Sequence, residues 1–81
     1  MEINMSISNE AVIKLIETSF PDAKITVDGD GYKYETTVIC KSFEGLNTLK
    51  RHQAVYASVN SAITSGDLHA LTITAKTPDE A

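Results

Sequence analysis

Two runs of alternating apolar and polar residues, 24–28 and 32–40, are joined through an Asp-Gly-Asp-Gly segment at residues 28–31. Glycine adopts the positive φ angles of tight turns, and aspartate side chains bond to nearby backbone N–H groups, so this segment predicts a turn. The alternation predicts two strands, each with one buried face. The sequence therefore predicts a β-hairpin, which needs a further layer to cover its apolar side.

Helical periodicity is found before the hairpin. Apolar residues recur at helical spacing from Ser8, a suitable N-cap, to Phe20. Pro21 then ends the helix, because the residue before a proline avoids the α region.

A second helical segment is predicted over residues 48–65, with Asn47 as its N-cap and Gly66 as its stop. Its apolar positions are interrupted near residues 57–58, which indicates two short helices or one kinked helix. The predicted buried stripe consists of Leu49, Tyr56, Val59, Ala62 and Ile63.

Residues 68–75 alternate again and predict a final strand, parallel to the second one. The element order α-β-β-α-α-β predicts an α+β two-layer sandwich with a three-stranded mixed sheet. We expect one domain over residues 1–81, in which residues 1–7 and 78–81 are frayed ends.

Composition narrows the function classes. The 81 residues carry a net charge of −4 and no signal peptide or membrane-length apolar stretch, so we expect a cytoplasmic protein without a membrane role. One cysteine cannot form an internal disulfide or a Cys-x-x-Cys site. Cys40 has the parity of the buried face of its strand, which favours core packing over a reactive thiolate. No reaction class is indicated, so an enzyme is not expected.

His69 is the strongest candidate for chemistry. It begins the final strand beside the turn at residues 66–67, where a side chain reaches solvent. A neutral imidazole is a good ligand for iron, zinc or copper. The alternative is a partly exposed histidine that forms one backbone hydrogen bond. A metal role needs further ligands, from a second molecule or from elsewhere in the fold.

Four short motifs occur in order: Phe43-x-Gly45, Arg51-His52-x-x-Val55-Tyr56, His69-Ala70-Leu71 and Thr77-Pro78. Their order and spacing in a domain of this size resemble the BolA family. The short turn at residues 28–31 resembles its IbaG-like branch. The resemblance implies a class II KH-like fold for nearly the entire chain.

The resemblance also implies a function. BolA-like proteins pair with monothiol glutaredoxins, which carry glutathione, and share a bridging [2Fe–2S] cluster. The resemblance implies that His69 is a ligand of this cluster. The family's other ligand position falls on Asp30, which is either a carboxylate ligand or a plain turn residue. We therefore expect a non-enzymatic module in iron–sulfur trafficking, with no cluster on the isolated chain, which would be a monomer or weak homodimer.

A basic cluster leaves three interpretations open: Lys41, Lys50, Arg51 and His52. It could meet an acidic partner face or the carboxylates of glutathione, which suit bidentate contacts with arginine. It could instead contact duplex DNA, as in a transcriptional regulator. The third interpretation is a solvated helix face on which His52 packs against the sheet edge.

Overall fold

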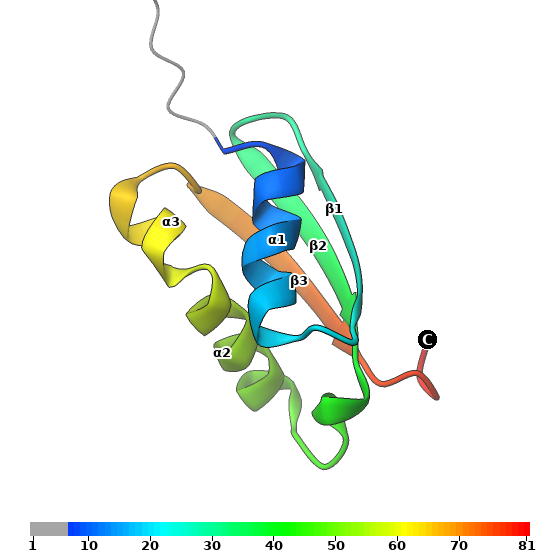
Figure 1. Cartoon of the computed structure of the whole chain (residues 1–81). Helices are drawn as coiled ribbons and strands as arrows, with labels where there is room; N and C mark the ends of the chain where they lie inside the picture. The colour runs from blue at the N-terminus through cyan, green and yellow to red at the C-terminus, as the bar shows by residue number, and fades with distance from the viewer. Residues whose placement is uncertain (1–6) are drawn as a thin grey trace, which may run out of the picture.

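The structure, a computed structural model, describes residues 7–81. Over this range, three α-helices lie on one face of a three-stranded sheet, which gives two layers (Figure 1). The elements in chain order are α1 (Asn9–Ser19), β1 (Lys24–Gly29), β2 (Lys33–Ile39), a short 3₁₀ helix η1 (Lys41–Phe43), α2 (Thr48–Ser58), α3 (Asn60–Ser65) and β3 (Ala70–Lys76). The predicted fold class and element order are confirmed.

The predicted hairpin is present. β1 and β2 pair antiparallel, from Lys24 opposite Ile39 to Gly29 opposite Tyr34. Every second residue of the β2 segment is buried beneath the helices: Tyr34, Thr36, Val38 and Cys40. The other face of β2 points away from the helical layer, which explains the alternation in the sequence.

β3 returns to the sheet beside β2 and runs parallel to it, as predicted. The strand order is β1-β2-β3, so β1 and β3 are the edges. β3 begins at Ala70, two residues later than expected, because Leu68 does not join the ladder. The N–H of Leu68 donates to the carbonyl of Ala62, and its side chain is only 1% exposed.

The helix boundaries follow the predicted capping residues. The side chains of Ser8 and Asn47 accept hydrogen bonds from Ala11 N–H and Lys50 N–H. The predicted interruption in the second helical segment falls at Val59, which ends α2 and precedes α3. Gly66 ends α3 with φ of 87°, a left-handed conformation that a side chain disfavours.

The predicted stripe along α2 and α3 is wrong in part. Val59 and Ala62 are buried, but Leu49, Tyr56 and Ile63 are 64%, 42% and 38% exposed. Val55 is fully buried in their place. Val55 and Val59 are four residues apart, so one helical turn directs both into the core. The sequence prediction placed Tyr56 on the buried face of α2. Tyr56 lies about 100° around the helix axis from Val55, so the predicted face is rotated away from the observed one.

The core lies between the helices and the sheet. Its members come from all three helices, from β2 and β3, and from the segments that connect them: Val12, Ile16, Tyr34, Val38, Cys40, Phe43, Val55, Val59, Ala62, Leu68 and Ile73. Partly buried side chains of β1, Ile25 and Val27, pack against this cluster. One continuous core therefore joins every element to the sheet.

Hydrogen bonds reach backbone groups near both ends of the described range. The expectation that residues 7 and 78–81 are frayed stays a prediction. The N–H of Ile7 donates to the carbonyl of Asp67, and its carbonyl accepts from the hydroxyl of Tyr34. At the other end, the N–H of Glu80 donates to Thr77 O, and the N–H of Thr77 donates to Glu80 Oε1. The expectation for residues 1–6 lies outside the described residues.

Candidate metal-ligating end of the sheet

His69 lies immediately before β3 and is exposed. Its position is fixed on both sides, because Leu68 is anchored in the core and Ala70 begins the ladder with β2. The imidazole therefore stands at the end of the sheet, accessible from solvent, as the sequence predicted. The side chain is therefore open to contact with another molecule.

The hairpin turn lies beside His69. The first pair of the β2–β3 ladder is Lys33 opposite Ala70, so Tyr32 and His69 are the residues that directly precede it. Their ring centroids are 5.7 Å apart, and the ring planes are inclined by 31°. Tyr32 is 64% exposed, so both rings stand at the solvent-facing end of the sheet.

Asp30 organises this turn. Its Oδ1 accepts hydrogen bonds from the N–H groups of Lys33 and Tyr32, each at 2.9 Å. These two bonds, that of Lys33 first, hold the pKa of the Asp30 carboxyl below its ordinary value, because they favour the charged form. In this geometry, the Asp30 side chain stabilises the turn. Among residues 7–81, no group of three or more His, Cys, Asp or Glu side chains is arranged to hold a metal ion.

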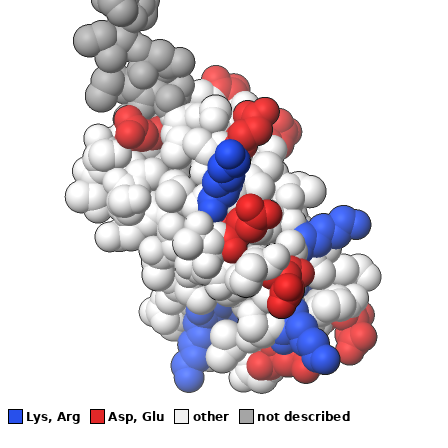
Figure 2. Space-filling view, in the orientation of Figure 1, with Lys and Arg blue, Asp and Glu red and all other residues white. Residues whose placement is uncertain are grey.

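The members of the predicted basic cluster come from two elements. Lys41 belongs to η1, whereas Lys50 and His52 belong to α2, where two residues of separation place them about 200° apart around the helix. Lys41 and Lys50 are exposed, and His52 is half-buried. On the face that carries α1, basic side chains alternate with acidic ones rather than forming a patch (Figure 2).

Arg51, the fourth member, is committed to contacts within the protein. Its Nε donates to Leu46 O at 2.9 Å, and its NH1 donates to Ala75 O at 3.2 Å. NH1 and NH2 also contact the two carboxylate oxygens of Glu80. The side chain is only 13% exposed. These bonds favour a structural role for Arg51, which sequence reasoning missed because Glu80 is 29 residues away in the chain.

Arg51 and Tyr56 also cover the free edge of β3. Cys40 N–H donates to Lys76 O, so alternate carbonyls of β3 face β2 and the others face outward. Arg51 binds the outward carbonyl of Ala75, and the hydroxyl of Tyr56 donates to that of Leu71 at 3.1 Å. Unpaired strand edges invite pairing with other chains, and these side chains occupy part of this one.

Cys40 lies at the opposite end of the sheet from His69. It follows β2, whereas His69 precedes the parallel strand β3 of seven residues, so about 20 Å of strand separates them. The thiol is 7% exposed and belongs to the hydrophobic core, as the strand parity predicted.

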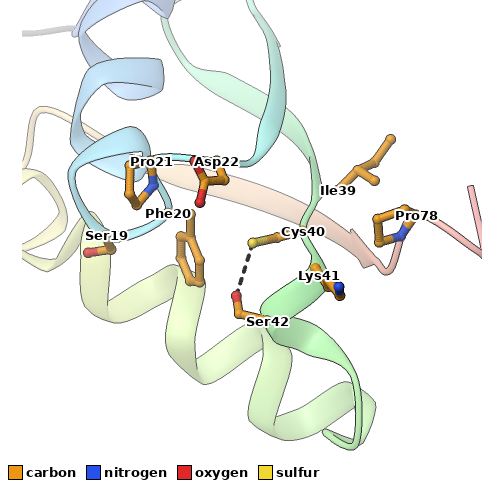
Figure 3. Close-up of a pocket in the computed structure, with 9 residues that line it drawn as sticks. All are labelled: Ser19, Phe20, Pro21, Asp22, Ile39, Cys40, Lys41, Ser42 and Pro78. Atoms are coloured by element: carbon orange, nitrogen blue, oxygen red, sulfur yellow. Dashed lines mark hydrogen bonds between the residues drawn. The ribbon is translucent and has the colours of Figure 1, made fainter.

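Figure 3 shows the Cys40 thiol directed toward Ser42, with Phe20 alongside. The Cys40 Sγ and Ser42 Oγ atoms share a hydrogen bond of 2.9 Å at the wall of a surface hollow. Because of the distance along the sheet, the thiol and the imidazole of His69 cannot act together.

Comparison with known proteins agrees with this architecture. The family model described as BolA-like protein matches residues 6–80. A protein from the rpoN–murA intergenic region of Acinetobacter guillouiae is 40% identical over 73 residues, which cover 90% of this chain and 88% of that protein. The acid stress protein IbaG of Escherichia coli K12 is 26% identical over 72 residues, covering 89% of this chain and 86% of IbaG.

A solved structure shares the fold closely. A BolA protein homologue from Coxiella burnetii superposes with a TM-score of 0.80 at 35% identity, covering 91% of this chain and 95% of that one. The α+β sandwich with a three-stranded mixed sheet is therefore the fold of BolA proteins. The chain belongs to the BolA family. In the described part of the chain, no helix has the length and apolar character needed to cross a membrane.

Proposed function

We propose that this BolA-family protein is a non-enzymatic module that partners a monothiol glutaredoxin and shares or receives its [2Fe–2S] cluster. The observation that carries the proposal is the exposed imidazole of His69, held at the end of the sheet by a buried neighbour and the first ladder pair. In this proposal the cluster is transferred between proteins and is not a resident cofactor. We also propose a cytoplasmic location, where reducing conditions would keep Cys40 as a free thiol.

The ligand chemistry supports a shared cluster rather than a resident one. His69 offers a nitrogen ligand, whereas the Oδ1 of Asp30 is already bound by two backbone N–H groups. The remaining ligands would therefore come from the partner and its glutathione. Imidazole in place of thiolate on one iron raises the reduction potential of a cluster, which suits transfer or sensing.

The test uses the two histidines of the chain as a matched pair. The full-length protein is mixed anaerobically with a glutaredoxin loaded with a [2Fe–2S] cluster, and visible absorption and circular dichroism are recorded. We expect the wild type and His52→Ala to change the spectrum, and His69→Ala to abolish or greatly reduce the change. Far-UV circular dichroism checks that each variant is folded. A His69→Ala spectrum identical to that of the wild type would remove the proposed ligand.

DNA binding by a transcriptional regulator is the second candidate, favoured by the exposure of Lys41 and Lys50. Against it, Arg51 is engaged within the protein and the chain carries a net charge of −4. It predicts salt-dependent binding to duplex DNA that weakens in Lys41→Ala and Lys50→Ala. Absence of binding at low salt would eliminate it.

A further inference from the structure

We propose that Tyr32 is a positioning residue for His69, holding the imidazole in the orientation in which it meets an incoming metal centre. This inference rests on the proposed function, since it assigns a role at the same site. The new element is Tyr32, a side chain that does not itself bind the metal. The contact between the two rings, at a centroid distance of 5.7 Å, is its basis.

The geometry is that of an attractive aromatic pair. Offset and tilted ring pairs are favourable at centroid distances of about 4.5–7 Å. The rings here are inclined by 31°, and Tyr32 remains 64% exposed. An aromatic ring this exposed contributes little to the core, so its contact with His69 stands apart from the packing that stabilises the fold.

The backbone of each partner is fixed independently of the rings. Tyr32 lies in a turn closed by the bond from Asp30 N–H to Lys33 O and by the two bonds to Asp30 Oδ1. His69 is fixed by the Leu68 anchor and by the ladder that begins at Ala70. The remaining freedom is in the side chains, and the Tyr32 ring limits the rotation of the imidazole.

Restricting a surface side chain before binding reduces the entropy lost when a ligand bond forms. For one aromatic contact of this kind, the expected gain in affinity is about 2- to 10-fold. The hydroxyl of Tyr32 has no part in this mechanism, so phenylalanine should replace tyrosine without loss. Alanine should not.

The first measurement uses the isolated protein and needs no cluster. The ring of Tyr32 should shift the Hδ2 and Hε1 proton resonances of His69 in NMR spectra through its ring current. We expect this shift in the wild type and in Tyr32→Phe, and its loss in Tyr32→Ala. Leu49→Ala is the control, because Leu49 is equally exposed and lies on α2.

The second measurement is titration of each variant with the cluster-loaded glutaredoxin, followed by visible circular dichroism. Tyr32→Ala should weaken the response about 2- to 10-fold, and Tyr32→Phe should restore it. Unchanged affinity in Tyr32→Ala, with a responsive wild type, would overturn the positioning role. Unchanged His69 resonances in Tyr32→Ala would overturn it as well. A wild type that gives no spectral response would instead contradict the proposed function, while the NMR measurement still tests the ring contact.

Discussion

The guanidinium of Arg51 and the carboxylate of Glu80 meet at two points, with NH1–Oε1 at 2.6 Å and NH2–Oε2 at 3.3 Å. The contact joins α2 to the turn that follows β3. The same NH1 donates to Ala75 O in β3, so one side chain connects the helical layer, the sheet edge and the C-terminal turn. Arg51 therefore resembles an internal brace more than a free cation awaiting a partner.

Replacement of Arg51 should destabilise the protein. Arg51→Ala removes charged hydrogen bonds to the carbonyls of Leu46 and Ala75, and we expect a loss of about 1.5–3 kcal/mol in the free energy of unfolding. Lys50→Ala, at the exposed neighbouring position, should change it by less than about 0.5 kcal/mol. Urea denaturation measures both. Equal stability of the two variants would contradict the bracing role.

Stability should depend on Glu80 as the solution becomes acidic. The hydrogen bond from Arg51, followed by that from Thr77 N–H, lowers the pKa of Glu80 from 4.5 to about 2. The folded state thus favours the carboxylate, and its stabilising contribution is complete above pH 4.5 and is lost as the pH falls toward 2. The stability difference between the wild type and Glu80→Gln should therefore shrink between pH 6 and pH 2.5. A difference independent of pH over this range would count against the ion pair.

Gly29 should tolerate no side chain. A Cβ atom at this position would lie within 2.8 Å of Cγ and Cε2 of Tyr34, whose ring is buried and whose hydroxyl is bound to Ile7 O. We expect Gly29→Ala to lower the free energy of unfolding by about 1–3 kcal/mol through overpacking. Asp28→Ala, at the exposed preceding position, is the control and should be nearly neutral in thermal denaturation.

The direction of α2 can be tested by truncating one buried and one exposed side chain. Val55→Ala should cost about 1.5–3 kcal/mol, because it removes two buried methyl groups and leaves a cavity. Leu49→Ala should stay within about 0.5 kcal/mol, because that side chain is 64% exposed. Chemical denaturation ranks the pair, and a larger cost at Leu49 would restore the stripe predicted from the sequence.

The two roles considered for Asp30 predict different outcomes for Asp30→Asn. Asparagine keeps the oxygen that accepts from Tyr32 and Lys33 N–H but lacks the charge of a carboxylate ligand. As a turn residue, Asp30 can be replaced by asparagine without change in the His69 resonances or the cluster spectrum, whereas Asp30→Ala should disturb both. Loss of the cluster spectrum alone in Asp30→Asn would instead indicate a metal ligand.

Signals confined to neighbouring residues were sufficient for the secondary structure. The turn predicted at residues 28–31 lies at residues 30–32, between β1 and β2. This turn, the N-caps Ser8 and Asn47 and the stop at Gly66 all act through bonds or φ angles within a few residues. The alternation in β2 also predicted the burial of Cys40, because strand parity alone selects the face. These features, with the motif pattern, were enough to predict the fold and the exposure of His69.

Tertiary structure decided which side chains are engaged. The commitment of Arg51 to Ala75 and Glu80, and the contact between Tyr32 and His69, join positions that are far apart in the chain. No local periodicity encodes such pairs, because they depend on the register of β3 against β2 and on how α2 lies across the sheet edge. The sequence thus determined the helices and strands and one candidate metal ligand. Packing between these elements determined which basic side chains remain exposed and which aromatic ring lies beside His69.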